Sequence, residues 1–439
     1  MKETLSPNRA RGLWDRFLQF SPGSAEIVAR NETLQEAAKD PGRLLQEGAK
    51  GRYRIEWQER VVRADSPTRR LAELRDWQRA ELVRLAWNCF AQPISAEKAA
   101  RGWTGLAEFT VETELGLAQD KAPEADRGKG QGFTVLALGK LGAGDLNFYS
   151  DLDLIFFRGE RDEEGAGNRL ARSLVGDLDA PGGERIYRVD LRLRPEGDRG
   201  ALVPQRSDLE EYYEAYGEVW ERCAWIRGRR IAGSEEEAYE FFQSLQSFIY
   251  PRGLSPSALG EIFQQKSRAE DELLADEDRD REIKRGRGGL REVEFPVLGL
   301  QLLHGAAQPT LQTHDLRKAI RNLEILGILK EEEAETLRGG YDFWRRLEDF
   351  LQMRQIRQTH QLPSSAEDMQ GLAQAMGAGS GGDLEKEVEE WRDRVRKVYD
   401  SVFGELKPLT VAGVDWVERV DWADPLSAKE AWNGLEPDE

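Results

Sequence analysis

The segment of residues 133–157, FTVLALGKLGAGDLNFYSDLDLIFF, restricts the possible folds more than any other part of the chain. Apolar residues from Phe133 to Leu138 predict a buried strand, and a glycine-rich connection leads to a second apolar strand. Asp151 and Asp153 stand at the start of that second strand. Because side chains in a strand alternate between two faces, both carboxylates should point to the same side. Neighbouring carboxylates repel each other, and Mg²⁺ is usually bound by one or two carboxylates together with substrate phosphates.

A third carboxylate is offered by RIYRVDLRLRPEGDRGALV, residues 185–203. Alternation in this segment predicts a strand with one apolar face and one charged face, the charged face carrying Arg188, Asp190, Arg192 and Arg194. An aspartate among arginines is unusual for a simple surface strand and suits a site where a metal ion and phosphates meet. Three acids from two neighbouring strands make a two-metal site possible.

Residues near the first strand are candidates for nucleotide binding. Gly139 and Lys140 lie where backbone amides and an ammonium group can meet a diphosphate or triphosphate. Ser150 either donates its hydroxyl to the ligand or caps the turn. Each piece alone has a simpler explanation: a DxD in an acidic chain is usually a solvated strand end, Lys140 is a surface lysine, and Arg192 and Arg194 are cross-strand ion-pair partners. Their order within one short α/β unit favours a nucleotidyltransferase.

Composition narrows the function further. The 439 residues include 63 Lys and Arg against 81 Asp and Glu, which gives a net charge of −18. We therefore expect no nucleic-acid partner, because binding to nucleic acid requires a basic surface. Two distant cysteines and three histidines outside catalytic spacings argue against a disulfide framework, a zinc site and serine–histidine chemistry. No stretch approaches the roughly 20 apolar residues of a membrane span, so we expect a soluble, cytoplasmic protein.

Hydrophobic periodicity divides the chain into four parts. We expect an N-terminal helical segment in residues 1–103, a nucleotidyltransferase domain with a small mixed sheet in 104–235, a helical bundle in 236–404 and an acidic tail in 405–439. The fold class is therefore α+β and mostly helical, and only helices are expected after Pro195. Those helices are predicted at 209–216, 219–229, 235–248, 258–274, 290–303, 316–326, 331–357 and 384–403.

A second informative segment is EIKRGRGGLREVEFPVLGLQLLHG, residues 282–305. Its glycines would allow the backbone to approach a ligand closely, and Lys284, Arg287 and Arg291 could then face phosphate. Arg291 and Glu294, three residues apart, could equally form a helical ion pair.

Aromatic residues at helical spacing lie between these two segments. They are Tyr212, Tyr213, Trp220 and Trp225. We expect them in the core rather than on a shelf that stacks a nucleotide base, because core packing is the usual reason for such a pattern. The three histidines, His304, His314 and His360, are expected to have structural roles only.

Three stretches resemble signatures of the bifunctional glutamine synthetase adenylyltransferase/adenylyl-removing enzyme family: LGKLGAGDLNFYSDLDLIFF, YRVDLRLRPEGDRGALV and IKRGRGGLREVEF. The likeness runs from Thr104 to Phe403. Family members resemble DNA polymerase beta in their nucleotidyltransferase core and carry two such halves in tandem, whereas this chain has one. The stretches EYYEAYGEVWERCAWIRGRRIAG, GGLREVEF and RRLEDFLQ are more similar to the N-terminal, adenylyl-removing half.

The resemblance implies that Asp151, Asp153 and Asp190 bind Mg²⁺, with Mn²⁺ as a substitute, and that Gly139 and Lys140 lie at the nucleotide. The wider superfamily has Gly-Ser where this chain has Gly139-Lys140. The family itself tolerates the lysine. The implied reaction is a phosphorolysis in which inorganic phosphate removes AMP from a tyrosine of glutamine synthetase and ADP leaves. Glutamine synthetase is then the partner, and a PII-type signalling protein is a possible regulator.

Other functions remain open at this stage. The chain could adenylylate glutamine synthetase with ATP, or it could bind nucleotide or a regulatory protein without catalysis. It could also transfer a nucleotide to a small molecule. The long helical region after Leu209 favours a protein acceptor, because it offers more surface than a small acceptor needs.

Overall fold

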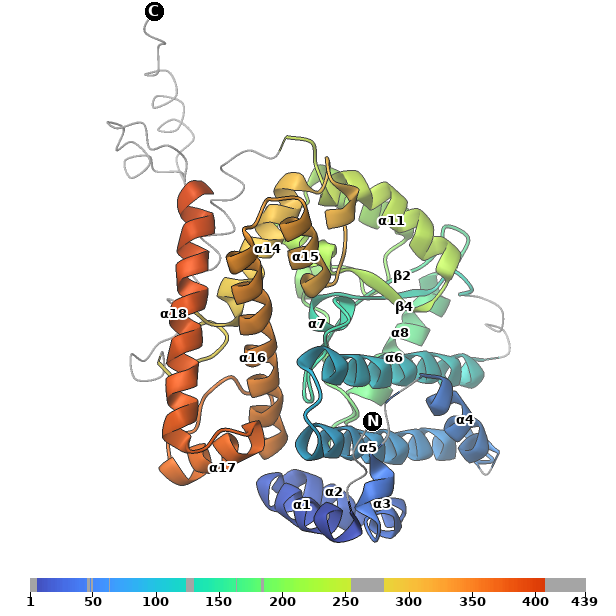
Figure 1. The fold of residues 1–439 in the computed structure, drawn as a ribbon. Coiled ribbons are helices and arrows are strands. Elements are labelled where there is room, and N and C mark those ends of the chain that lie inside the picture. Colours follow the sequence, from blue (N-terminus) through green and yellow to red (C-terminus); the bar gives the residue numbers. More distant parts are fainter. Residues whose placement is uncertain are drawn as a thin grey trace, which may run out of the picture.

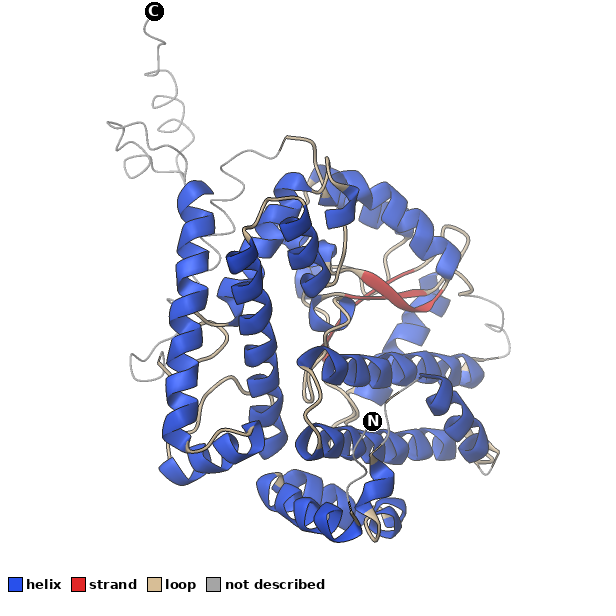
Figure 2. Cartoon of the chain, in the orientation of Figure 1, coloured by secondary structure: helices blue, strands red, loops and turns tan. Residues whose placement is uncertain are grey.

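Helices make up most of the structure and surround one small sheet (Figure 1). The computed structural model describes residues 6–45, 48, 50–62, 64–123, 130–162, 164–182, 185–253 and 280–406. The predicted class, α+β and mostly helical, is confirmed (Figure 2). The predicted helix at 258–274 and the tail beyond residue 406 lie outside the described residues. Among the helices of the described ranges, none is both long enough and apolar enough to cross a membrane.

The N-terminal part is helical, as predicted. Its helices are α1 (Pro7–Phe20), α2 (Pro22–Arg30), α3 (Glu32–Ala37), α4 (Lys50–Val61), α5 (Pro67–Ala91) and α6 (Ala96–Lys121). Ser66 and Ser95 begin the two longest, because each hydroxyl accepts a hydrogen bond from a backbone amide that has no partner inside its helix. Helix α6 runs without a break through residues 103 and 104, between which we expected a domain boundary, and it contacts a strand of the sheet at Arg229 through Glu108.

The sheet has the strand order β3-β2-β1-β4. Its strands are β1 (Thr134–Ala137), β2 (Leu152–Phe157), β3 (Val189–Asp190) and β4 (Arg229–Gly233). β1 is antiparallel to both β2 and β4, whereas β2 and β3 are parallel. A parallel pair needs a crossover, which α8 (Glu164–Leu178) supplies. Both faces of β1 and β2 are buried: the paired Val135 and Phe156 join the main core, and the paired Leu136 and Ile155 join a second core with α11 (Glu235–Ile249).

Two expectations about strands were wrong. The chain after Pro195 is not purely helical, because Arg229–Gly233 forms β4 where we expected the end of a helix at 219–229. The helix in question, α10 (Val219–Ile226), ends before Gly228, and the next residues pair with β1. The long alternating strand through Arg194 is also absent. Only Val189–Asp190 pairs with β2, because the chain turns directly afterwards, where the backbone amide of Arg192 donates to Oδ1 of Asp190 at 2.9 Å.

The C-terminal part is a set of packed helices. They are α9 (Arg206–Ala215), α14 (Leu290–His304), α15 (Leu316–Ile325), α16 (Glu331–Gln355), α17 (Ala366–Met376) and α18 (Gly381–Leu406). Helices were predicted at all of these positions except α17, with ends that differ by a few residues. In Figure 1, α16 lies between α18 and α6, and it contacts α6, α14, α15, α17 and α18.

Candidate active site

A cavity of about 700 Å³ lies at the edge of the sheet where β2 and β3 begin. The carboxylates of Asp151, Asp153 and Asp190 line this cavity, and so do Lys284 and, at the start of α14, Arg291. The predicted site residues that line the cavity are Gly139, Lys140, Ser150, Asp151, Asp153, Asp190 and Arg192. The structure thus brings together all of the predicted site residues except Arg194.

The strand pairing places the acidic residues side by side. Asp153 is the register partner of Asp190 across the parallel strands β2 and β3. The register is fixed at the same edge, because the backbone amide of Leu152 donates to the carbonyl oxygen of Arg188 at 2.9 Å. Asp151 stands one residue before β2 and is only partly exposed. Two carboxylates from neighbouring strands and a third beside them therefore share one cavity wall.

Electrostatics make two of these carboxylates hard to ionise. Burial and the nearby charge of Asp190 raise the pKa of Asp153 to about 6. Burial also raises the pKa of Asp151, against the opposing effect of the Arg188 guanidinium at 3.6 Å. Asp190 behaves oppositely, since hydrogen bonds from Arg192 lower its pKa. A cation placed between the carboxylates would lower the free-energy cost of ionising Asp151 and Asp153.

The donors at this edge suit a hard cation, although the three carboxylates are not gathered round one point. Within the described residues, no set of three or more His, Cys, Asp or Glu side chains is arranged to hold a metal ion. Asp190 is engaged by Arg192, whose Nε lies 3.0 Å from each of its two carboxylate oxygens. Mg²⁺ prefers oxygen ligands and needs only one or two carboxylates. Asp151 and Asp153 fit that requirement, and Asp190 could join them by leaving Arg192.

Gly139 is a glycine because Asp153 leaves no room for a side chain. Its backbone has φ 54°, which residues with a side chain rarely adopt. A Cβ atom at this position would collide with Oδ2 of Asp153. The glycine that begins the short helix α7 (Gly139–Gly142) therefore allows the buried carboxylate to lie against the backbone.

Lys140 is not a surface lysine. Its ammonium donates to Oδ1 of Asn147 and to Oε1 of Glu348, both at 2.6 Å, and its side chain is only 14% exposed. Glu348 lies on α16 and is fully buried. Burial alone would raise the pKa of this carboxyl, but Lys140 and Arg345 hold it well below its usual range. Helix α16 thus fixes the position of Lys140 at the cavity.

The same helix holds the loop that leads into Asp151, residues 145–149. Oδ1 of Asp349 accepts hydrogen bonds from the backbone amide of Phe148 at 2.9 Å and from the side chain of Asn147 at 3.2 Å. Oε1 of Gln352 accepts from the backbone amide of Tyr149 at 2.9 Å. We refer to these contacts from α16 as the loop clamp. Sequence reasoning missed it, although its residues lie in the stretch RRLEDFLQ that carried the family resemblance.

A buried charge cluster anchors the first residue of this loop. The carboxylate of Asp145 accepts hydrogen bonds from the guanidinium of Arg317 on α15 at 2.8 Å and from the hydroxyl of Tyr341 at 2.5 Å. Nε of Arg345 lies 3.2 Å from its carboxylate. Burial opposes the charge on Asp145, but the two arginines lower its pKa. The loop is therefore fixed at both ends by side chains of the C-terminal helices.

The second predicted segment contributes residues to the same cavity. Lys284 lines the cavity, and burial together with the neighbouring Lys140 lowers its pKa to about 8. Arg287 does not line it and instead pairs with Asp393 at 2.9 Å. Glu294 lies 3.2 Å from Arg227.

Two glycines of this segment, Gly288 and Gly289, are required by close backbone packing. Gly288 has φ 65°, and a Cβ atom there would collide with the backbone of Arg392. A Cβ atom on Gly289 would lie 2.6 Å from the carbonyl oxygen of Ile283. Both glycines therefore let the segment fold tightly against its own backbone and against α18.

The remaining predicted residues divide between the cavity and other places. Arg194 points away, since its guanidinium donates to the carbonyl oxygen of Leu191 at 3.0 Å and lies 3.5 Å from Asp198. The hydroxyl of Ser150 donates to the carbonyl oxygen of Asp151 at 3.2 Å. Among the aromatic residues, Tyr213 and Trp225 are in the core as predicted. Trp220 is not, because it is partly exposed and lines the cavity.

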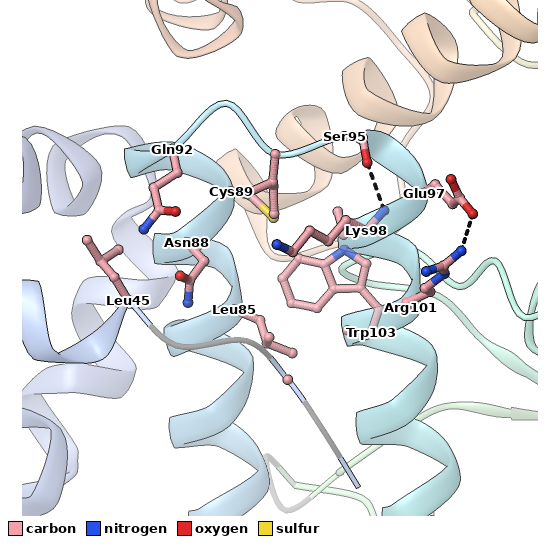
Figure 3. Close-up of a pocket in the computed structure, with 14 residues that line it drawn as sticks. Leu45, Leu85, Asn88, Cys89, Gln92, Ser95, Glu97, Lys98, Arg101 and Trp103 are labelled. Atoms are coloured by element: carbon pink, nitrogen blue, oxygen red, sulfur yellow. Dashed lines mark hydrogen bonds and ion pairs between the residues drawn. The ribbon is translucent and has the colours of Figure 1, made fainter. Parts of the chain in front are cut away.

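A second cavity, of about 430 Å³, lies between the end of α5 and the start of α6 (Figure 3). Its wall includes Cys89, whose pKa is raised well above the usual range by burial, so the thiol is not poised as a nucleophile. Arg101 faces Glu97 at the rim and pairs with it. This cavity holds neither a carboxylate cluster nor an activated group among its described residues, so it does not compete with the first as the reactive site.

A small mixed sheet carries the clustered carboxylates, and cations from the helical part of the chain line the same cavity. This is the architecture of a nucleotidyltransferase-like α+β protein. Residues 15–244 match the family model described as glutamate-ammonia ligase adenylyltransferase, and residues 261–403 match the model described as PII-uridylyltransferase. The chain therefore belongs to the glutamate-ammonia ligase adenylyltransferase family.

Individual relatives agree with this assignment. A bifunctional glutamine synthetase adenylyltransferase/adenylyl-removing enzyme of Thioalkalivibrio sulfidiphilus is 35% identical over 349 residues, which cover 76% of this chain and 36% of the relative. A protein of the same description from Stenotrophomonas maltophilia is 33% identical over 399 residues, covering 87% of this chain and 42% of the relative. The chain thus spans well under half the length of these relatives.

Proposed function

We propose that the chain is a nucleotidyltransferase that removes AMP from the adenylylated tyrosine of glutamine synthetase, with inorganic phosphate as acceptor and ADP as product. The observation that carries the proposal is the cavity that Asp151, Asp153 and Asp190 line together with Lys284 and Arg291. The relatives are named for adding and for removing the adenylyl group. The likeness of GGLREVEF and RRLEDFLQ to the adenylyl-removing half supports removal.

In the proposed reaction, an oxygen of inorganic phosphate attacks the phosphorus of the adenylyl group. The bond between that phosphorus and the tyrosine oxygen breaks, and the tyrosine oxygen takes up a proton. The products are ADP and the unmodified tyrosine. No covalent bond to the enzyme is needed, so the work of the chain is positioning and charge stabilisation.

The site residues divide this work between binding the metal ion and contacting the nucleotide and phosphate. Asp151 and Asp153, joined by Asp190, would hold Mg²⁺ or Mn²⁺, which when bound neutralises charge on the reacting phosphate. Arg192, released from Asp190 by that rearrangement, is then available to a phosphate oxygen. Lys140 stays tied to Glu348 and contributes a fixed positive charge at the nucleotide. Trp220 offers an aromatic surface inside the same cavity for the adenine base.

The proposed protein partner is glutamine synthetase, and a PII-type signalling protein is a proposed regulator. The second proposal is supported by the match of residues 261–403 to the PII-uridylyltransferase model. We place the reaction in the cytoplasm, where glutamine synthetase and nucleotides would be available. The net charge of −18 speaks against a nucleic-acid partner.

The test uses adenylylated glutamine synthetase, phosphate and Mg²⁺, and measures ADP and unmodified glutamine synthetase. Wild type should produce both, and Asp153→Asn should reduce the rate at least 100-fold, as expected when a charge-stabilising group is lost. Asp198→Asn is the matched control, because this aspartate lies outside the cavity and its side chain is 84% exposed. Absence of ADP with an intact partner, or equal rates for Asp153→Asn and wild type, would contradict the proposal.

A parallel reaction with ATP and unmodified glutamine synthetase tests the opposite direction. Incorporation of AMP in that reaction, with no ADP released from the adenylylated partner, would establish adenylylation in place of removal. Binding of nucleotide and partner without turnover in either reaction would identify a non-catalytic module.

A further inference from the structure

We propose that Lys284 is the centre of a preformed subsite for a phosphate group, in the cavity that Asp151 and Asp153 also line. This inference deepens the proposed function and rests on it, because it assigns a place to the phosphate that the carboxylate wall does not hold. The positive charges that line the cavity differ in whether an acidic side chain neutralises them.

Most cations that line the cavity already have a partner. Lys140 binds Glu348 at 2.6 Å, and Arg227 lies 3.2 Å from Glu294. Arg192 is hydrogen-bonded to Asp190, and Arg188 lies 3.6 Å from Asp151. These charges are therefore neutralised before any ligand arrives.

Lys284 differs from this group. No side chain or carbonyl among the described residues accepts a hydrogen bond from its ammonium, although the side chain lines the cavity and is partly buried. Three acids act on its charge: Glu348 and Glu294 are engaged with Lys140 and Arg227, and Asp153 is one of the carboxylates proposed to bind a cation. A half-buried ammonium without a hydrogen-bonded counter-ion attracts an anion.

The backbone that carries Lys284 is rigidly built. The buried carboxylate of Glu282 accepts hydrogen bonds from the backbone amides of Lys284 and Arg285, both at 2.8 Å. The carbonyl oxygen of Lys284 accepts from the backbone amide of Arg291 at 2.9 Å, and Ile283 is bonded to the backbone of His360 at 3.0 Å. The ammonium is therefore presented from a fixed turn, which lowers the entropic cost of binding.

The charges around Lys284 select the kind of anion. Arg291 adds positive charge near Lys284, whereas the carboxylates of Asp151 and Asp153 in the same cavity repel an anion until a cation is bound there. A compact group with two negative charges satisfies this arrangement better than a single carboxylate. Two sources share that chemistry: free orthophosphate, and the terminal phosphate of a nucleoside triphosphate.

The test compares Lys284→Gln with wild type in direct binding measurements, so that it does not depend on turnover. Titration calorimetry with inorganic phosphate, with ATP and with AMP, each in the presence of Mg²⁺, gives the affinities. We expect Lys284→Gln to weaken phosphate or ATP about 10- to 100-fold, the loss of one charge-assisted hydrogen bond, and to leave AMP unchanged. Lys284→Arg should restore part of the affinity. Lys386→Gln is the control, because that lysine is 78% exposed on α18.

The pattern of losses distinguishes the two sources. Weaker binding of orthophosphate identifies the site of the attacking phosphate, and a higher KM for phosphate with an unchanged KM for adenylylated glutamine synthetase should accompany it. Weaker binding of ATP alone identifies the site of a terminal nucleotide phosphate. Equal affinities of Lys284→Gln and wild type for both ligands, with equal thermal unfolding, would overturn the subsite. A chain that binds phosphate through Lys284 but produces no ADP would keep the subsite and reject the proposed reaction.

Discussion

Replacing Asp153 by asparagine should stabilise the metal-free protein at neutral pH, although it removes a proposed catalytic group. Burial and Asp190 raise the pKa of Asp153 from an ordinary value of 3.8 to about 6. The folded chain therefore binds this proton more tightly than the unfolded chain does. As the pH rises from about 4 to about 6, ionisation of Asp153 lowers the free energy of unfolding, and the full penalty, about 3 kcal/mol at most, is present above that range. Asparagine has nearly the same shape and carries no charge, so it avoids the penalty.

Urea unfolding in the presence of EDTA measures this effect. At pH 7.5 the variant should be more stable than wild type by about 1 to 3 kcal/mol, and near pH 4 the difference should vanish. Asp198→Asn, at an exposed aspartate outside the cavity, should show no such change. Saturating Mg²⁺ should stabilise wild type and not Asp153→Asn, because a ligand stabilises only the state that binds it.

Two outcomes would refute the reasoning. A lower stability of Asp153→Asn at pH 7.5 would mean that the ionised carboxylate has a favourable partner in the folded chain. A stability gain of equal size at pH 4 and pH 7.5 would mean that the effect does not come from charge. Either result would remove the argument that this wall of the cavity is prepared for a cation.

Three further predictions concern the same site. Gly139→Ala should reduce the rate of ADP release about 100-fold, since its Cβ would displace the carboxylate of Asp153. Gly144→Ala is the control. It places alanine at a similar positive φ of 73°, but no atom lies within 4 Å of its added Cβ. Glu348→Gln should lower the free energy of unfolding by about 3 to 5 kcal/mol, because Lys140 and Arg345 lose a buried counter-charge, whereas Glu389→Gln at a 62% exposed acid should change it little. The apparent affinity for Mg²⁺, measured by titration, should fall as the pH drops below about 6, since a proton then competes for Asp153, and an affinity independent of pH between 5 and 7 would speak against this ligand.

The sequence predicted those features that depend on short-range pattern. The strands on either side of the glycine turn and the position of Asp151 and Asp153 follow from alternation and from turn residues within one segment of the chain. Asp190 was predicted from the alternation within residues 185–203, and it is the register partner of Asp153. The same alternation failed for Arg194, since the strand has only two residues and the chain turns at Arg192.

Features that depend on distant partners were not predictable in this way. β4 is short and begins with two arginines, and it is a strand only because β1 pairs with it about a hundred residues earlier in the chain. The partners of Lys140 and of the loop clamp lie on α16, and no local pattern marks Glu348, Asp349 or Gln352 as different from other polar positions of a helix. Their burial results from packing of α16 against α6, which the sequence does not display.

The loop clamp also has a consequence for biosynthesis. The amide of Phe148 and its acceptor Asp349 are 201 positions apart, and those of Tyr149 and Gln352 are 203 apart. A ribosome makes the carboxylate wall long before it makes α16, so the growing chain holds the acidic residues without the contacts that order them. The site is completed only when α16 has emerged and packed. Translation order thus delays assembly of the reactive centre until the helices that surround it exist.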